Sequence, residues 1–553
     1  MQKIKFYIAA VLLFFSIASC TKNFEDEPRE FVTEDYIWSE VDPTGTYAQN
    51  FIANIYSQLP FGYNRVNGVS LDCLTDDAVP SNDASATWNF IRSGYSPFVT
   101  FDDNWTNSYA GIRKANIFLA NYKRIPWADP VRPRWFSAEA RFLRSFFYYE
   151  MIKRYGGVPL IGDKVLTLQD DISFPRNSFD ECVTYMVSEL DAIKDSLRSE
   201  NNLTDRANQT DPDGGRATKG AVLALKAKVL LLAASPLYNT TNDLNKWKTA
   251  AEAAKAVMDM NNYMLEPNRY TLYTNRVNRE NIFYRQNGGN GNGYVFTVAP
   301  VGYRPNNTSS QGLISPTQEL VDAFPMKNGL AINATGSGYS AANPYANRDP
   351  RLDQTIFYNG LMWLKRPVET FEGGLDKPNS ATQTVQTKTG YYSKKFVAND
   401  ANSTAYSNVT STWTFIRYAD ILLAYAEAQN EFAGPSTEVY NAVQLVRQRA
   451  GLVPFALAAG LTKDQVRTII RNERRVEFAF EEQRFYDIRR WKIAEAVYGT
   501  TLHGVKIIKN ANGSFTYSPI DVVRPFFSSA MYKLPISNNE ILKNRNLIQN
   551  EGY

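Results

Sequence analysis

The sequence predicts a mostly α-helical protein in which paired helices form a frame and long loop-rich segments are inserted between the pairs. Two observations support this fold class. Several stretches place apolar residues at helical spacing and end at Gly or Pro, whereas residues 262–412 are rich in Asn, Gly, Pro, Ser and Tyr and lack a sustained helical period. The chain has 553 residues, 44% of them hydrophobic, so it can bury a large core and is not intrinsically disordered.

The charge balance and the histidine count exclude several classes of function. The 60 Lys and Arg residues nearly balance the 56 Asp and Glu residues, and the formal net charge is +4. A nucleic-acid binder that relies on a basic surface is therefore not expected. His503 is the only histidine, so Ser-His-Asp catalysis, Cys-His catalysis or a histidine-rich metal site would have to use this one residue. We expect no cofactor and no metal site.

The N-terminus has the features of a targeting segment. Lys3 and Lys5 precede the apolar run Phe6–Ala18, which is shorter than the roughly 20 residues that a membrane-spanning helix needs. The following sequence, IASC, ends at Cys20 and resembles the bacterial lipobox, in which the cysteine is acylated. We therefore predict a lipoprotein signal peptide over 1–19 and lipidation of Cys20. An ordinary secretory signal with an incidental cysteine is the alternative.

Residues 20–35, called the tether segment below, are predicted to form an acylated, flexible tether. The segment is polar and carries the acidic sequence EDE at 25–27. This cluster resembles the signal with which some Gram-negative bacteria send lipoproteins to the cell surface. Several acyl chains hold a protein on a membrane more strongly than one chain does, so we expect a lipid anchor in the outer membrane, with the protein facing the exterior.

The other cysteines are Cys73 and Cys182. Two are too few for a disulfide framework or for a zinc site built from cysteines. They either pair with each other or are two buried thiols.

The first helical region is predicted over 36–261. Asp129-Pro130 can open a helix whose apolar residues point almost all round as far as Tyr149, and glycines 156 and 157 end it. Such a helix should be sandwiched between other helices. Further helices are expected over 178–197, 217–234 and 247–258.

The second helical region is predicted over 413–553 and opens with the helices 413–431 and 438–450. Helix pairs with small residues at close-contact positions predict tetratricopeptide-like repeats, although no strict 34-residue self-similarity is present. The loop-rich region 262–412 separates the two helical regions, and a second loop-rich stretch covers 60–104. Loops of this length inside a compact protein are usually functional.

Three carboxylates, Glu473, Glu477 and Glu481, are spaced to share one helix face. Paired carboxylates can be the acid and base of a glycosidase. Carboxylates on one regular helix rarely converge on a bond in a cleft, however, so a structural ion-pair network is favoured. Four arginines are the expected partners: Arg471, Arg474, Arg475 and Arg484. Just before this stretch, the sequence TKDQ from Thr462 predicts a capping box.

Several stretches, taken together with the lipobox, resemble the SusD/RagB family of outer-membrane lipoproteins. They follow the family's order along the mature chain: AEARFLR at 138–144, YGGVPL at 155–160, RYADILL at 417–423, ERRVEFAFE at 473–481, RFYDIRRW at 484–491, and the tail from Leu534 to Tyr553. The departures are small. Glu482 stands where the family often has Gly, and Ser537 and Arg545 stand where it often has Pro.

The resemblance implies a non-catalytic glycan-binding lipoprotein. Such a protein captures an oligosaccharide or polysaccharide and delivers it to a SusC-like TonB-dependent transporter in the outer membrane, here by packing the helical-repeat face on the barrel. Peptide capture, known in the same family, is an alternative. A surface glycoside hydrolase is a less favoured one, and its candidate acids are Asp76, Asp77, Asp102 and Asp103.

A glycan site needs exposed aromatic rings beside planar polar groups, because sugars present flat C–H faces and many hydroxyls. Two loop segments, 72–96 and 284–307, supply this mixture, and the resemblance places ligand contacts in matching regions. The predicted ligand-binding residues are Asp76, Asp77, Trp88, Asn89, Arg92, Tyr95, Tyr284, Tyr294, Tyr303 and Arg304. A core position is the alternative for Trp88 and for each Tyr, and Trp363 is expected inside.

Overall fold

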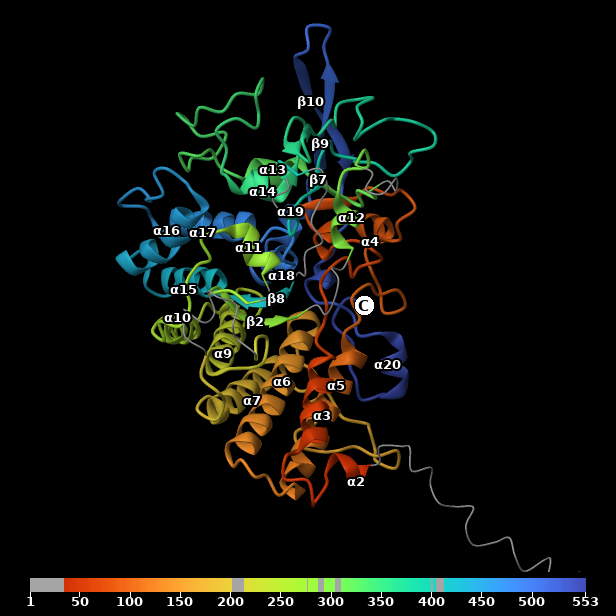
Figure 1. The fold of residues 1–553 in the computed structure, drawn as a ribbon, viewed down its shortest axis with the longest axis vertical. Coiled ribbons are helices and arrows are strands. Elements are labelled where there is room, and N and C mark those ends of the chain that lie inside the picture. Colours follow the sequence, from red (N-terminus) through yellow and green to blue (C-terminus); the bar gives the residue numbers. More distant parts are fainter. Residues whose placement is uncertain are drawn as a thin grey trace, which may run out of the picture.

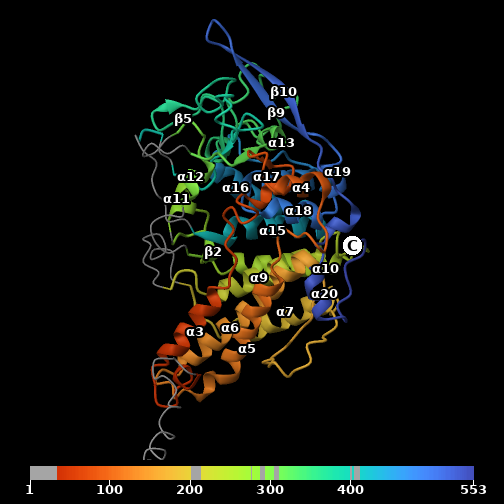
Figure 2. The ribbon, with the colours of Figure 1, turned by 90° about the vertical axis from the view of Figure 1, so that its right-hand side faces the viewer.

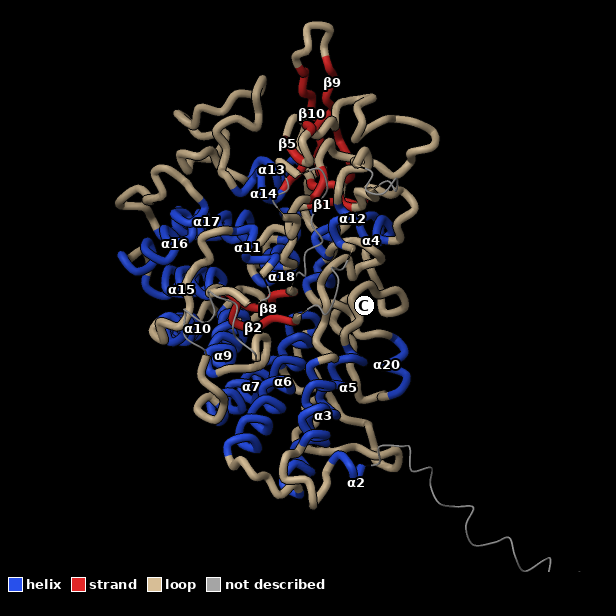
Figure 3. Tube along the Cα trace, in the orientation of Figure 1, coloured by secondary structure: helices blue, strands red, loops and turns tan. Residues whose placement is uncertain are grey.

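The computed structural model describes residues 34–200, 213–275, 277–286, 293–303, 310–398, 401–403 and 412–553. In this part of the chain the helices form an elongated frame, and loops with short strands gather at one end of it (Figure 3). A two-stranded hairpin projects beyond these loops (Figure 1). The predicted fold class, a mostly helical, tetratricopeptide-like frame with long loop-rich insertions, is confirmed.

The frame is one continuous array of packed helices. Each helix packs on the next along the chain from α3 through α5, α6, α7 and α9 to α10, and α10 then packs on α15 although residues 259–417 intervene (Figure 2). The frame therefore continues across the loop-rich region. Its helices are α2 (Glu34–Ile37), α3 (Thr46–Tyr56), α5 (Trp105–Asn121), α6 (Val131–Tyr155), α7 (Phe179–Ile193), α9 (Lys219–Ala234), α10 (Leu244–Met258), α15 (Tyr418–Ala433), α16 (Thr437–Ala450), α17 (Lys463–Glu477) and α18 (Gln483–Arg490).

Helix α6 is buried on nearly all sides, as its sequence predicts. It packs against α3, α5, α7 and α9, so its apolar residues find partners inside the chain. Gly156 ends it with a φ of 77°, a left-handed backbone conformation that glycine adopts without strain. Helix α15 is used in the same way, with α9, α10, α16 and α17 around it.

The strands pair only in twos among the described residues, always antiparallel. Strands β2 and β8 come from the two ends of the loop-rich region and bring those ends together. The pairs are β1 (Ala78–Pro80) with β3 (Ile314–Pro316), β2 (Asn281–Arg285) with β8 (Trp413–Arg417), β4 (Ile356–Phe357) with β7 (Tyr392–Ser393), β5 (Met362–Trp363) with β6 (Arg366–Pro367), and β9 (Leu502–Lys509) with β10 (Phe515–Val523).

Short helices complete the fold. They are α4 (Thr87–Ser93), α11 (Arg269–Thr274), α12 (Tyr294–Val298), α13 (Gln318–Ala323), α14 (Arg351–Thr355), α19 (Ala494–Tyr498), α20 (Asn538–Lys543) and the 3-10 turns Leu71–Leu74, Tyr122–Arg124 and Ser529–Tyr532. One large hydrophobic core fills the frame and a second fills the loop-rich end, where Trp363 is fully buried as predicted. No helix of the described ranges combines the length and the hydrophobicity that crossing a bilayer requires.

Two predicted helix boundaries are wrong and one cap is confirmed. Trp413 begins strand β8, and the helix expected from it starts only at Tyr418. Helix α17 ends at Glu477, so Glu481 follows the helix instead of sharing its face. Thr462 and Gln465 form the predicted capping box of α17. The two remaining cysteines are free, buried thiols.

Candidate functional site

The chain forms a hollow of about 320 Å³, called the polar hollow below, where the end of α3, the start of α5, the end of α6 and the last residue of β2 meet. It joins the early loop-rich stretch to the central one, but of the two predicted ligand segments only 284–307 contributes a lining residue, Arg285. Its lining residues are Ser57, Gln58, Leu59, Pro60, Phe61, Arg65, Phe101, Asp102, Asp103, Asn104, Asn107, Arg154 and Arg285.

The start of α5 provides one wall of the polar hollow, with the side-chain amides of Asn104 and Asn107. Asp103 accepts a hydrogen bond from the backbone N–H of Trp105 at 3.0 Å and so caps the helix. Asn104 donates from Nδ2 to the Ser108 hydroxyl at 2.9 Å, which fixes the orientation of its side chain. Asn107 lies three residues further along, on the same helix face, and is exposed.

Buried ion pairs fix the opposite wall. Asp102 is buried and binds both Arg154, with Nε 2.8 Å from Oδ2, and Arg65. Burial by itself raises the pKa of Asp102, but the two guanidinium groups outweigh it and lower the pKa to about 2. Asp102 is therefore ionised at neutral pH. A glycosidase acid needs a raised pKa, so this candidate acid lacks the property that its role requires.

Glu482 completes this wall from behind. Its carboxylate lies 2.6 Å from Nε of Arg65 and also accepts from Nη2 at 2.8 Å. The backbone φ of Glu482 is 60°, in the left-handed region that favours glycine. Glycine adopts this conformation without strain. In this chain the strained position carries a side chain that binds an arginine of the polar hollow, and burial raises the pKa of its carboxyl.

Arg285 is the one arginine of the polar hollow that has no carboxylate within ion-pair distance among the described residues. It is half-buried at the end of β2, donates from Nη1 to the Leu59 carbonyl oxygen, and lies over the Phe61 ring, 5.5 Å from its centroid. Burial lowers its pKa, although a guanidinium stays charged at neutral pH. Its remaining N–H groups can bind hydroxyl or carboxylate oxygens of a ligand.

The structure assigns the predicted Asp76 and Asp77 to a buried ion-pair cluster outside the polar hollow. Asp76 binds Arg484 through two hydrogen bonds of 2.9 and 2.8 Å, and Asp77 lies 2.7 Å from Nη2 of Arg475. Burial alone would raise the pKa of Asp76, but the nearby arginines outweigh burial and lower it. At Asp77 burial is the larger effect, and the pKa is raised. These pairs join the loop before β1 to α17 and α18.

Four of the five predicted aromatic residues are buried. Trp88, Tyr284, Tyr294 and Tyr303 expose 3, 4, 5 and 5% of their surface, so these rings are not the exposed platforms that the sequence suggested. Trp88 donates from Nε1 to the Asn82 carbonyl oxygen at 3.0 Å. The Tyr294 and Tyr303 rings lie in the core of the loop-rich region. The core alternative is the one that the structure supports for all four.

The other predicted positions differ in exposure. Asn89 and Arg92 are exposed on α4, with the Arg92 guanidinium 4.8 Å from the centre of the Trp88 ring system. Tyr95 is half-buried and donates to the Met531 carbonyl oxygen at 2.9 Å. Arg304 lies outside the described residues. None of these three described side chains lines the polar hollow.

Sequence reasoning missed the residues that give the polar hollow its character. Phe61 and Arg65 lie in the early loop-rich stretch, and Arg285 directly follows the predicted Tyr284. One signal in the sequence is the pair of neighbouring acids Asp102 and Asp103. The structure, and not the sequence, shows that Arg65 and Arg154 neutralise Asp102 and that Asp103 accepts a hydrogen bond from the first residue of α5.

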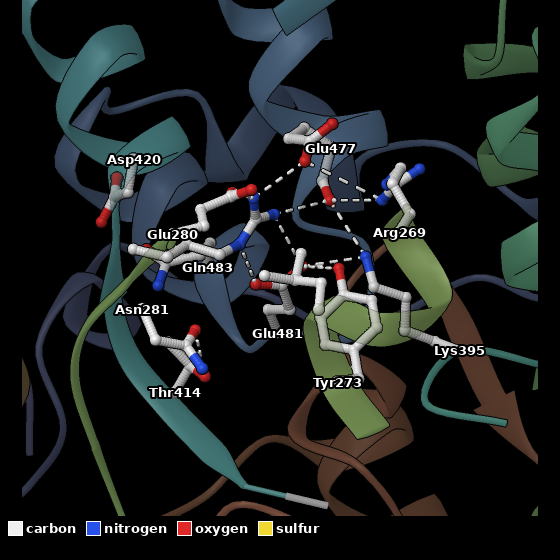
Figure 4. A network of polar contacts seen from close by, with 12 residues as sticks. Arg269, Tyr273, Glu280, Asn281, Lys395, Thr414, Asp420, Glu477, Glu481 and Gln483 are labelled. Carbon is white, nitrogen blue, oxygen red and sulfur yellow. Dashed lines mark hydrogen bonds and ion pairs between the residues drawn. The ribbon is translucent and has the colours of Figure 1, made fainter. Parts of the chain in front are cut away.

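Glu473, Glu477 and Glu481 form a buried ion-pair network, but its cations are not the predicted ones, since Arg474, Arg475 and Arg484 bind other carboxylates. Glu473 and Glu477 are buried and bind Arg351, and Glu481 lies 2.9 Å from Nζ of Lys395. Figure 4 shows Glu477 and Glu481 turned toward Arg269 and Lys395 in the interior. The structural interpretation of these acids is therefore supported. Among the described residues, no three His, Cys, Asp or Glu side chains gather as metal ligands would.

Comparison with known proteins connects this geometry to a family. A model described as the SusD family matches residues 239–553, and one described as starch-binding and associating with the outer membrane matches residues 39–231. SusD-like protein P2 of Formosa agariphila is 27% identical over 490 residues, covering 84% of each chain.

Solved structures agree. A SusD-like protein from Bacteroides fragilis is 28% identical with a TM-score of 0.79, and the match covers 94% of this chain and 99% of that one. A SusD-like carbohydrate-binding protein from the same species is 23% identical with a TM-score of 0.74, covering 93% and 100%. The SusD family model alone spans more than half of the sequence. The chain belongs to the SusD family.

Proposed function

We propose that this protein captures a glycan in the polar hollow, does not cleave it, and delivers it to a SusC-like TonB-dependent transporter. The observation that carries the proposal is Arg285, a half-buried cation that lines the hollow without a carboxylate partner among the described residues. A starch-binding family model and a carbohydrate-binding structural neighbour support the choice of ligand class.

The lining of the polar hollow fits a sugar chain. Phe61 offers an aromatic face that is half-buried, and Gln58, Asn104 and Asn107 offer planar amides. A sugar ring packs its C–H face on an aromatic ring, while amides and guanidinium groups fix its hydroxyls. Because buried ion pairs already hold Arg65 and Arg154, the hollow is organised before a ligand enters.

A binding function without cleavage also agrees with the charges. Asp102 has its pKa lowered to about 2 by two arginines, and Asp103 is exposed and caps α5. Asp102 therefore lacks the apolar surroundings that keep a catalytic acid protonated near neutral pH. We therefore assign both carboxylates to the walls of a binding site.

The anchoring part of the proposal rests on the N-terminus. Cys20 and the signal peptide lie outside the described residues, and lipidation of Cys20 is proposed from the lipobox. The description of the second matching family model, which names association with the outer membrane, supports attachment to that membrane.

Calorimetry tests the ligand. The mature protein is titrated with a panel of plant, host and microbial oligosaccharides and with oligopeptides, and each mixture is then analysed for products. We expect binding of at least one glycan without product formation, and about tenfold weaker binding by Arg285→Ala. Arg113→Ala, which removes an exposed arginine outside the polar hollow, is the matched control and should bind normally. Binding of peptides alone, or release of shorter sugars, would contradict the proposal.

Mild detergent extraction tests the partner. We expect a TonB-dependent transporter to co-purify with the mature protein. In the complex, the frame helices should be the part of the protein nearest the transporter barrel. The apolar residues of α6 and α15 are already covered within the chain, so the contact must use other frame residues. Recovery of free monomer alone would count against delivery to a transporter while leaving glycan capture intact.

A further inference from the structure

The opposite face of α5 borders a second hollow of about 310 Å³, called the apolar hollow below. The segment from Pro159 to Phe174 and the C-terminal helix α20 with Leu547 close its other sides. Aromatic and aliphatic side chains line it: Trp105, Tyr109, Ile112, Pro159, Ile161, Leu166, Ile172, Phe174 and Leu547. A hollow with this lining fits an aromatic or aliphatic side chain better than a sugar, because it offers few polar partners.

Cations without ion-pair partners lie at the rim of the apolar hollow. Arg113 is exposed and donates from Nε to the Leu166 carbonyl oxygen at 3.3 Å, and Lys164 is exposed with Nζ 5.4 Å from the centre of the Phe174 ring. Neither has a carboxylate within ion-pair distance in the described ranges. Lys543, the third cation, binds Glu540 at 2.7 Å. The rim therefore favours a ligand that joins an aromatic group to negative charge.

The acids nearest in sequence do not neutralise this rim by pairing. Asp170 accepts hydrogen bonds from the backbone N–H and the hydroxyl of Thr167, and Asp171 accepts one from the Ser173 N–H. Asp163 binds the buried Arg144. Asp170 and Asp171 thus hold their own loop, and Asp163 joins the loop to α6. The hydrogen bonds from Thr167 lower the pKa of Asp170, and Lys164 is close enough to lower it further.

The tether segment has the matching chemistry. Phe24 is followed directly by Glu25, Asp26 and Glu27, so one aromatic ring stands beside three carboxylates. The other aromatic residue of the tether segment, Phe31, is preceded by Arg29 and Glu30 and lacks such a cluster. We propose that Phe24 occupies the apolar hollow and that the acids after it lie against Arg113 and Lys164.

The reach of the chain agrees with this docking. Asp35, at the start of the described chain, lies 3.4 Å from Arg124, just beyond the end of α5. Moving back along the chain from Arg124 to Arg113 covers about 16 Å at the helical rise of 1.5 Å per residue. The tether segment between Phe24 and Asp35 spans up to about 36 Å when extended. Helices α2, α5 and α20 all lie toward the lower right in Figure 1.

Docking would orient the protein. Cys20 precedes Phe24 by four residues, so in the docked state the proposed lipid anchor lies close to the apolar hollow and to α5, whose other face borders the polar hollow. This consequence rests on the proposed lipid anchor, whereas the docking itself does not. A docked tether segment holds the body in one orientation above the membrane, and its release lets the body swing.

Photo-crosslinking in the full, membrane-attached chain tests the docking. Benzoylphenylalanine is introduced at Lys22, and cross-linked peptides are identified by mass spectrometry. We expect cross-links to residues 159–174 to exceed those to 129–134 at least fivefold. Residues 129–134 are the matched reference because they follow Ala128, which donates to the Pro43 carbonyl oxygen near the start of the described chain.

Three variants decide the outcome. The cross-linking yield at 159–174 should fall to the yield at 129–134 in the Phe24→Ala variant. The same fall is expected in the double variant Arg113→Glu with Lys164→Glu. Lys248→Glu, which reverses an exposed charge on α10, should leave the yield unchanged. Equal yields at the two segments in the unmodified chain, or a yield at 159–174 that survives Phe24→Ala, would overturn the proposal, whether or not the polar hollow binds glycans.

Discussion

The polar hollow and the apolar hollow have nearly equal volumes, about 320 and 310 Å³, and share the first turns of α5 as a wall. Asn104 and Asn107 face the first hollow, while Trp105 and Tyr109 line the second. Because successive helical residues point about 100° apart, one stretch of chain presents amides on one side and aromatic rings on the other. Volume alone therefore says nothing about the ligand, and the lining decides it.

The two hollows also differ in how their charges are held. In the polar hollow Arg65 and Arg154 are fixed by buried carboxylates, and Arg285 is left for a ligand. In the apolar hollow the cations Arg113 and Lys164 are exposed at the rim. Exposed charges contribute little to stability, whereas breaking a buried pair is costly. The comparison therefore predicts that substitutions of the paired charges of the polar hollow lower stability, whereas substitutions of the rim charges of the apolar hollow affect only docking.

The largest effect is expected from Asp102→Ala. This change leaves Arg65 and Arg154 without their shared carboxylate, and breaking a buried pair in this way costs about 3–5 kcal/mol of unfolding free energy. Denaturant unfolding monitored by circular dichroism measures the loss. The neighbouring Asp103→Ala removes only an exposed cap and should cost about 1 kcal/mol or less. Equal losses for the two variants would show that the wall of the polar hollow is not held by Asp102.

The pH dependence of stability is the next effect in size. The pKa of Asp102 falls from an ordinary 3.8 to about 2 in the folded protein. Because the pKa is lower in the folded state than in the unfolded state, the Asp102 carboxylate stabilises the fold fully at a pH above its unfolded pKa. This stabilisation is lost as the pH falls through the two pKa values, between about pH 4 and pH 2. Its size is about 2 kcal/mol. The difference in unfolding free energy between the unmodified protein and Asp102→Asn should therefore shrink by this amount over that interval, and a constant difference would contradict the ion-pair assignment.

Arg285→Ala and Arg113→Ala compare the hollows directly. Loss of Arg285 should weaken glycan binding by about 1.4 kcal/mol, which is tenfold, because a charge-assisted hydrogen bond is lost. The stability of the Arg285→Ala variant should change little, because Arg285 is only half-buried and has no paired carboxylate. Arg113→Ala should change neither glycan affinity nor stability. Calorimetry and thermal unfolding on the two variants measure both quantities, and weaker glycan binding by Arg113→Ala would mean that the hollows do not act separately.

Much of the frame could be predicted from the sequence because its signals are local. Apolar residues all round α6 require a buried helix, Gly156 ends it, and the capping box at Thr462 starts α17. The end of α17 was harder to predict. The sequence continues helical spacing to Glu481, yet the backbone turns at Phe480 and Glu482, both with positive φ, and the buried pairs of Arg417 with Glu477 and Glu481 stabilise that turn.

Little of the candidate site could be predicted from the sequence, since Arg285 is the one lining residue that falls in a predicted ligand segment. The sequence does not show whether the ring of an aromatic residue in a loop is exposed or buried. In this chain, Tyr294 and Tyr303 are buried in the hydrophobic core of the loop-rich region. Asp76 and Asp77 looked like ligand contacts because their partners, Arg475 and Arg484, lie some 400 residues away in sequence. Arg285 lies one residue from a predicted contact, but its lack of a paired carboxylate is a property of the fold.

The smallest effect expected concerns Glu482, where the polar hollow meets a strained backbone. Glu482→Gln keeps the φ of 60° and removes the charge that binds Arg65, whereas Glu482→Gly removes the charge and the strain together. A left-handed conformation costs a non-glycine residue about 1 kcal/mol, so Glu482→Gly should be the more stable variant by about that amount. Unfolding free energies of the two variants measure the difference. If Glu482→Gln is equally stable or more stable, backbone strain at this position does not decide the difference, and the side chain must be packed more favourably than its backbone suggests.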